Sequence, residues 1–384
     1  MLGVNLCRLA VAVTFLFSGF VKAVDPVGMS YKLNAYFSNW GFFFDDDSTR
    51  LLFLSVAFAC MEFVLGIYML LGIRRRFTTA AVVLFMTAMT LLTLYVYLYN
   101  PVPDCGCFGE AVVLSNGQTL VKNLILLLAA IVLFRKKWYI RRLISERNQW
   151  ITSVFSWVYV IGLSLYSIHY LPVLDFTSYR VGTDLRSALT DPEAPVDLQA
   201  FVLFSADEAM DERHEALLED TGYTFILTLP DIALADDGCC DRINDIYDDC
   251  TDMGFGMYGV TSGNPSMINQ WKDRTGASYP FLVGEDTQLK AMVRSNPGLL
   301  LLKDGVIKAK WSNNDLPSLT GQSSWQEERD GQAGALLKLI LWFFVPLSVV
   351  TLADRIWIGS KYYRHYIFKK QLKKESHEKE NCGR

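Results

Sequence analysis

Charged residues are scarce in this chain of 384 residues, where Asp, Glu, Lys and Arg together make up 20%. An average soluble domain has about a quarter. Histidine is also rare, at four residues, and no internal repeat or low-complexity tract is visible. With 51% apolar residues, this composition excludes a single soluble enzyme, a disordered chain and a nucleic-acid binder with one basic face.

The few charges are distributed unevenly along the chain. Residues 173–333 contain 28 Asp and Glu against 12 Lys and Arg, a net charge of −16. The remaining residues contain 12 against 24, a net charge of +12, and the whole chain has −4. The chain therefore reads as a basic, apolar membrane part joined to an acidic, water-soluble part.

Six apolar segments are long enough to cross a bilayer, which takes about 20 mostly apolar residues. They are residues 5–23, 51–73, 78–99, 118–135, 151–171 and 335–353. Arg8 gives the first segment the basic flank of a signal peptide, but residues 21–25 form a poor cleavage site. Because five more segments follow, we interpret the first as a retained anchor.

Lys and Arg in short loops indicate the orientation, since such loops stay in the cytoplasm. Residues 74–76, the loop 135–147 and the tail after Asp354 are rich in these cations and share one side under a six-pass alternation. Loop 24–50 has two and loop 100–117 has none. We expect a multi-pass protein of the bacterial inner membrane, with both termini cytoplasmic and residues 173–333 periplasmic.

This topology divides the chain into five parts and makes the lipid bilayer its first partner. We expect a four-helix membrane domain at 1–140, a fifth transmembrane helix at 151–172, a periplasmic domain at 173–333, a sixth transmembrane helix at 334–354 and a basic cytoplasmic tail at 355–384.

The periplasmic part has the pattern of an α/β domain. Short apolar runs predict strands at 223–229, 255–261, 280–283, 299–303 and 306–311, with helices at 241–253, 265–275 and 286–294. This order implies a mixed sheet with helices on its faces. The fold class is thus a membrane α-helical bundle with an α/β periplasmic domain.

Over residues 220–315 the order resembles the thioredoxin fold. Residues 295–298 (Ser-Asn-Pro-Gly) look like the proline loop of that family, so the resemblance implies that Pro297 is a cis-proline. A redox-active thioredoxin has Cys-x-x-Cys at the start of the helix after the first strand. Here that place holds the adjacent Cys239 and Cys240, flanked by Asp236, Asp237 and Asp241, whose charges oppose a thiolate.

Five of the eight cysteines fall on the expected periplasmic side, where disulfides persist. They are Cys105, Cys107, Cys239, Cys240 and Cys250. Cys250 shares the apolar face of its helix, so we interpret it as a core residue. The histidines on this side, His169 and His214, lack metal-ligand spacing, and the sequence predicts no metal site.

The loop at 101–110 contains Cys105-Gly106-Cys107. Glycine permits the unusual backbone that two thiols this close would need to face each other. The resulting disulfide would be strained and prone to exchange. Asp104 and Glu110 would raise the thiol pKa, whereas the next helix N-terminus would lower it, and the sequence does not decide between them. In the alternative, this is a tight turn whose cysteines pair elsewhere, for instance with Cys239 or Cys240.

Two ionisable residues in the apolar segments are placed to pair beneath this loop. Lys22 lies at the outer end of the first segment and Glu62 towards the outer half of the second. Ionisable groups in membranes are usually paired. The pair reads either as a proton or quinone head-group site, with quinone the candidate cofactor, or as an ion pair that stabilises the bundle.

The first 140 residues resemble the MauE/DoxX family of small four-helix membrane proteins. The resemblance is carried by residues 104–109 (Asp-Cys-Gly-Cys-Phe-Gly), residues 17–23 with Asp25-Pro26, and Glu62 with Leu65-Gly66. It implies a redox-associated inner-membrane protein. MauE is linked to methylamine utilisation and to the maturation of a disulfide-rich periplasmic dehydrogenase subunit. The added thioredoxin-like domain resembles DoxX-family proteins of Bacteroidota.

The leading hypothesis is a factor for thiol–disulfide exchange or maturation of periplasmic proteins, a candidate thiol–disulfide oxidoreductase. Cys105 and Cys107 would cycle between dithiol and disulfide. The outer domain would bind a periplasmic client or thiol partner, or relay electrons to it through Cys239 or Cys240. The alternative is a non-enzymatic membrane scaffold whose thioredoxin-like domain only binds partners. A transporter is a third reading, although the spans lack paired Gly/Pro-interrupted helices.

Overall fold

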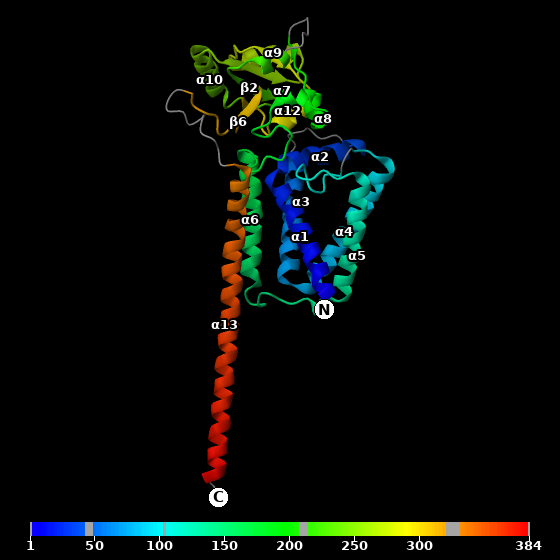
Figure 1. Cartoon of the computed structure of the whole chain (residues 1–384), viewed down its shortest axis with the longest axis vertical. Helices are drawn as coiled ribbons and strands as arrows, with labels where there is room; N and C mark the ends of the chain where they lie inside the picture. Colours follow the sequence, from blue (N-terminus) through cyan, green and yellow to red (C-terminus); the bar gives the residue numbers. More distant parts are fainter. Residues whose placement is uncertain (1, 43–48, 103–104, 207–213, 320–330, 383–384) are drawn as a thin grey trace.

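The computed structural model describes residues 2–42, 49–102, 105–206, 214–319 and 331–382. Figure 1 shows a helical bundle, a sheet-containing domain at one end of it, and a long C-terminal helix that begins near that domain, runs beside the bundle and extends beyond it. Six helices in the described part are long and apolar enough to cross a membrane: Gly3–Val24, Thr49–Leu71, Arg75–Tyr99, Asn116–Arg135, Gln149–His169 and Gln332–Arg364. The six predicted segments fall on these helices, and the chain is a multi-pass membrane protein.

The N-terminal bundle consists of α1 (Leu2–Val24), α3 (Thr49–Leu71), α4 (Arg75–Tyr99) and α5 (Asn116–Arg135). Helices α1 and α3 approach each other closely at two glycines. A Cβ atom on Gly19 would lie 2.9 Å from the Ala59 carbonyl oxygen, and one on Gly66 would lie 2.8 Å from the Leu16 nitrogen. Small residues at this contact bring Lys22 of α1 within reach of Glu62 of α3.

Helix α2 (Pro26–Asn39) runs across the end of the bundle that faces the sheet (Figure 1). Asp25 caps it by accepting a hydrogen bond from the Gly28 N–H at 2.8 Å, and Pro26 occupies the first turn. These are the usual signals of a helix start. A search for long apolar runs does not find α2, because half of its residues are polar or small.

Helix α6 (Gln149–His169) lies beside α13 (Gln332–Cys382), and a short 3-10 helix, η1 (Lys137–Tyr139), precedes them. The Tyr159 hydroxyl donates to the Leu339 carbonyl at 3.0 Å, and Phe155 stacks on Phe343. The sixth span and the basic tail, expected as separate parts, are one continuous helix of 51 residues.

The part between α6 and α13, here called the sheet domain (residues 173–319), contains six strands in the order β1-β4-β3-β2-β5-β6. They are β1 (Phe204–Ser205), β2 (Tyr223–Leu229), β3 (Gly256–Thr261), β4 (Phe281–Val283), β5 (Gly298–Lys303) and β6 (Val306–Ser312). Strands β2, β3 and β4 are parallel, whereas β5 is antiparallel to both β2 and β6. The predicted mixed sheet is confirmed.

Helices cover both faces of this sheet. They are α7 (Leu185–Thr190), α8 (Val196–Gln199), α9 (His214–Glu219), α10 (Cys240–Met253), α11 (Pro265–Thr275) and α12 (Asp286–Met292). Alternate residues of β2 enter opposite cores: Phe225 packs with the α10 and α11 side, and Ile226 with the α12 side. Cys250 is fully buried in the first core, and the Asn296–Pro297 bond is cis, as the resemblance to thioredoxins implied.

Candidate functional site

The two cysteines of the loop between α4 and α5 face each other. Their Sγ atoms are 3.0 Å apart. Gly106 between them has a φ of +65°, and a Cβ atom there would lie 2.6 Å from Cδ of Lys32. The Gly109 N–H donates to the Gly106 carbonyl at 3.0 Å and closes the turn. The sequence-based expectation that glycine lets the thiols face each other agrees with this geometry.

A buried ion pair between α1 and α3 contacts the cysteine loop from the bundle side. Lys22 Nζ lies 2.8 Å from Glu62 Oε2, and both side chains are almost fully buried. The same ammonium donates to the Cys107 carbonyl at 2.7 Å and to Ser18 Oγ at 2.6 Å, and Ser18 Oγ donates to the same carbonyl at 2.6 Å. The pair predicted from the sequence therefore fixes the backbone of Cys107.

The two thiols differ in burial and in acidity. Cys105 is buried, whereas Cys107 is partly exposed. A hydrogen bond from the Cys105 thiol lowers the pKa of Cys107 to about 6, with help from the charges of Lys122 and Lys22 against the opposing effects of burial and Glu62. The same hydrogen bond and burial raise the pKa of Cys105. At neutral pH, Cys107 is thus the thiolate and Cys105 its hydrogen-bond donor.

Lys122 lies at the site, although the sequence marks it only as an ionisable residue at the edge of an apolar segment. It lies on α5, and its Nζ is 4.1 Å from the centroid of the Phe108 ring, next to Cys107. The signal in the sequence was a lone lysine in an apolar run, seven residues after the N-cap Ser115. That spacing places it near the end of α5 from which the cysteine loop departs.

A cavity of about 30 Å³ lies on the bundle side of Cys107, and Ser18, Glu62, Phe108 and Lys122 also line it. This is about the volume of one water molecule in the liquid, and a quinone head group is several times larger. The three donors of the Lys22 ammonium are already engaged by Glu62, Ser18 and the Cys107 carbonyl. The Lys22–Glu62 site therefore does not fit a quinone.

The cysteines of the sheet domain are in a different environment. Cys239 is the N-cap residue of α10, and Cys240 begins that helix. Burial, the neighbouring thiol and Asp236 raise the pKa of Cys239 to about 12. Burial and Asp237 raise the pKa of Cys240 to about 11. Both thiols are protonated at neutral pH, which makes them poor nucleophiles.

The sequence predicts that two acidic residues of the cysteine loop, Asp104 and Glu110, raise the pKa of the thiols. Asp104 lies outside the described residues. The Glu110 carboxylate is paired with Arg294 of the sheet domain, 2.6 Å from Nη2, which offsets the repulsion expected at the thiols. Within the described residues, no group of three or more His, Cys, Asp or Glu side chains could hold a metal ion.

Comparison with known proteins finds a family model that matches the first third of the chain. Residues 2–135 match the family model described as Methylamine utilisation protein MauE. No curated protein matches the chain. A solved structure, "Solution structure of a putative protein disulfide isomerase from Bacteroides thetaiotaomicron", matches at 14% identity and a TM-score of 0.23, over 36% of this chain and 82% of that chain. The family match includes the cysteine loop, Lys22, Glu62 and Lys122.

Proposed function

We propose that this chain, whose residues 2–135 match the MauE family model, exchanges disulfides with periplasmic proteins through Cys105 and Cys107. The observation that carries the proposal is the 3.0 Å separation of two thiols of unequal acidity. One thiol of an exchanging pair must be a thiolate near neutral pH, and the second must be near enough to resolve the intermediate. Cys107 and Cys105 suit these two roles.

The reaction follows from this assignment. The Cys107 thiolate attacks one sulfur of a client disulfide, forms a mixed disulfide and releases the other client sulfur as a thiolate, which takes up a proton. Cys105 then loses its proton and attacks the Cys107 sulfur, which forms the Cys105–Cys107 disulfide and releases the second client thiol. Two electrons pass from the loop to the client. One proton comes from Cys105, and the other is taken up from water by the first client thiolate, because Cys107 has already lost its proton. The reverse sequence oxidises a client dithiol.

The proposed exchange requires the cysteine loop and the sheet domain to lie on the periplasmic side of the membrane. Arg loops and the basic tail support cytoplasmic termini in an inner membrane, which would place the cysteine loop and the sheet domain in the oxidising periplasm. By the resemblance described in the sequence analysis, the client would be a protein that needs disulfides to mature. The sheet domain would bind that client without exchanging electrons, because the pKa values of Cys239 and Cys240 are raised.

Trapping of the intermediate tests the exchange. Full-length Cys105→Ser protein in detergent, treated with glutathione disulfide, is expected to keep glutathione on Cys107, because the resolving thiol is missing. The matched Cys107→Ser variant is expected to gain less, since Cys105 is buried and burial alone still raises its pKa. Mass spectrometry of the loop peptide gives the readout. Equal labelling of both variants, or of neither, would refute the assignment.

The second candidate is a membrane scaffold without redox turnover. It is favoured by the same raised pKa values in the sheet domain, which leave its thioredoxin-like fold to binding alone. A scaffold predicts that the redox state of the loop does not respond to the glutathione ratio. Exchange predicts that the fraction of Cys105–Cys107 disulfide follows that ratio.

A further inference from the structure

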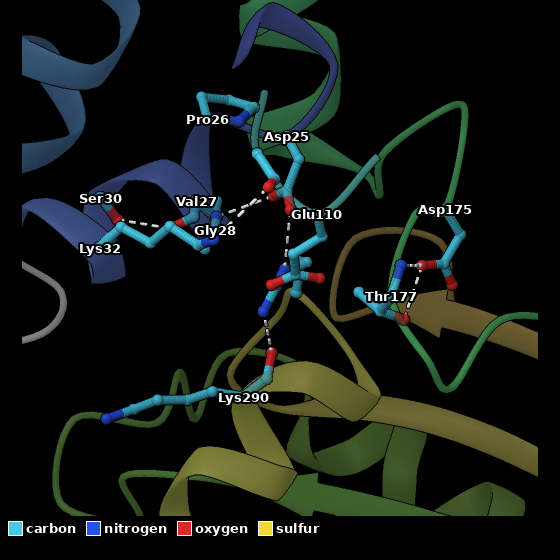
Figure 2. Close-up of polar contacts among 12 residues, drawn as sticks. Asp25, Pro26, Val27, Gly28, Ser30, Lys32, Glu110, Asp175, Thr177 and Lys290 are labelled. Carbon is cyan, nitrogen blue, oxygen red and sulfur yellow. Dashed lines mark hydrogen bonds and ion pairs between the residues drawn. The ribbon is translucent and has the colours of Figure 1, made fainter. Parts of the chain in front are cut away.

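A second cluster of buried charge lies where the sheet domain meets the cysteine loop. At its centre is Arg294, which follows α12 and precedes the cis Asn296–Pro297 bond. Its side chain is 5% exposed. Its Nε lies 3.1 Å from Asp25 Oδ2, and its Nη2 lies 2.6 Å from Glu110 Oε1. Figure 2 shows the Asp25 and Glu110 side chains close together, with Lys290 of α12 on the other side of the cluster.

The contacts of Arg294 join three parts of the chain. Asp25 is the N-cap of α2 in the bundle, Glu110 is three residues beyond Cys107, and Nη1 of Arg294 donates to the Lys290 carbonyl at 2.6 Å within the sheet domain. One guanidinium thus binds two carboxylates of the membrane part from a fixed position on the sheet domain. The planar fork of arginine suits this bridge, whereas a lysine ammonium lacks that fork.

The cysteine loop is therefore held from two sides. From within the bundle, Lys22 and Ser18 bind the Cys107 carbonyl. From the sheet domain, Arg294 binds Glu110 at the end of the same loop. On the other side of the thiol pair, the Tyr36 hydroxyl of α2 donates to the Cys105 carbonyl at 3.2 Å. The two thiols, 3.0 Å apart, lie between this contact and the attachments at Cys107 and Glu110.

We propose that Arg294 is a positioning residue through which the sheet domain sets the reactivity of the Cys105–Cys107 pair. The inference rests on the proposed exchange function. Without Arg294, Glu110 loses its partner and the end of the loop is released. The Cys105 thiol then binds the Cys107 thiolate less well, and that hydrogen bond is the largest contribution to the acidity of Cys107. A partner that pulls the sheet domain from the bundle would have the same effect.

Several charged groups face the loop from the elements around it, and any pH profile of Cys107 includes their effects. They are Lys22 of α1, Lys32 of α2, Glu62 of α3, Lys122 of α5, and Glu110 with its partner Arg294. Among them, only Arg294 belongs to the sheet domain. Its replacement therefore separates the influence of that domain from the influence of the bundle.

The test is the pH profile of Cys107 alkylation by iodoacetamide in the full-length protein in detergent. Arg294→Met and Arg294→Gln are compared with the wild type, and Arg186→Met is the control. Arg186 is a sheet-domain arginine that binds the Leu218 carbonyl and Asp304, away from the loop. Arg294→Lys tests rescue, because it restores one positive charge without the fork.

We expect the midpoint of the profile to move to higher pH in Arg294→Met and Arg294→Gln, with alkylation at pH 7 at least about threefold slower. Arg186→Met should match the wild type, and Arg294→Lys should lie between. Unfolding of part of the sample would leave the midpoint of the Cys107 alkylation profile of the remaining folded molecules unchanged. A folded Met or Gln variant whose profile superimposes on that of the wild type would overturn the inference. A wild-type midpoint near that of an ordinary thiol would instead refute the proposed function.

Discussion

The Cys105 thiol lies 3.0 Å from the Cys107 sulfur and donates its hydrogen bond to it across a single glycine. This contact makes two chemically identical residues unequal, since one becomes a thiolate and the other its stabilising donor. Lys22 and Ser18 bind the Cys107 carbonyl, and Arg294 binds Glu110 three residues further along the loop.

The acidity of Cys107 predicts the pH dependence of its reactivity. Its pKa is lowered to about 6 in the folded protein, against about 8.5 for a free thiol. The thiolate therefore forms as pH rises through 6 and is lost as pH falls below it. Alkylation of Cys107 should increase about tenfold between pH 5 and pH 7 and then level off. A rate that still climbs steeply above pH 8 would contradict the lowered pKa.

Lys122 should contribute to this acidity through its charge. Replacing Lys122 with Met removes a cation that lowers the pKa of Cys107, so the alkylation midpoint should rise and the rate at pH 7 should fall several-fold. Lys272→Met is the matched control, because Lys272 also lies over an aromatic ring, that of Phe281, but in the sheet domain. An unchanged alkylation midpoint in Lys122→Met would show that Lys122 does not contribute to the acidity of Cys107.

Gly106 should be intolerant of a side chain. Alanine at a φ of +65° costs about 1–2 kcal/mol, and its Cβ would also meet the Lys32 side chain. We expect Gly106→Ala to lower stability in detergent and to slow alkylation of Cys107, because the sulfurs no longer meet. Gly162→Ala on α6, where no atom lies within 4 Å of a Cβ, should preserve both properties. Wild-type alkylation in Gly106→Ala would show that the turn geometry is irrelevant to reactivity.

The Lys22–Glu62 pair should matter both for stability and for the loop. Glu62→Gln leaves a buried ammonium without its carboxylate, a change that costs about 3–5 kcal/mol in other proteins. Replacing both residues with Met should cost less, because no unpaired charge remains, but the double variant also loses the hydrogen bond to the Cys107 carbonyl. Thermal unfolding in detergent should separate the two. Equal stability of Glu62→Gln and the double variant would argue against an ionised pair.

Cys239 and Cys240 should be dispensable for exchange. Their pKa values are raised to about 12 and about 11, so few of these thiols ionise at pH 7. The Cys239→Ala/Cys240→Ala variant is expected to exchange with glutathione disulfide at the wild-type rate. An exchange rate at least about tenfold lower than that of the wild type would indicate that Cys239 or Cys240 relays electrons.

Much of the fold could be predicted from local patterns. Apolar runs predict the six spans, and alternation with turn residues predicts β2 to β6 of the sheet domain within a residue or two. The two-residue strand β1 was missed. Helix α2 was missed because it lies across the end of the bundle and needs no apolar run. The tail, interpreted from the sequence as a helix end, belongs to α13.

Part of the site was also readable, because Lys22, Glu62 and the cysteine loop each carry a local signal. Arg294 was not, because its partners Asp25 and Glu110 are 269 and 184 residues away in the chain. Nor could the sequence assign the thiolate. The inequality of Cys105 and Cys107 arises mainly from the hydrogen bond between the two thiols, and the charges of Lys122 and Lys22 lower the pKa of Cys107 further. Only the folded chain brings these groups together.

The most direct test of the account is a map of the disulfides formed by Cys105, Cys107, Cys239 and Cys240 in membranes, made by mass spectrometry at a series of glutathione ratios. The account predicts a Cys105–Cys107 disulfide whose fraction rises and falls with the ratio, while Cys239 and Cys240 form no bond to the loop. A Cys105 or Cys107 bonded to Cys239 or Cys240, or a loop pair that stays oxidised at every ratio, would contradict it.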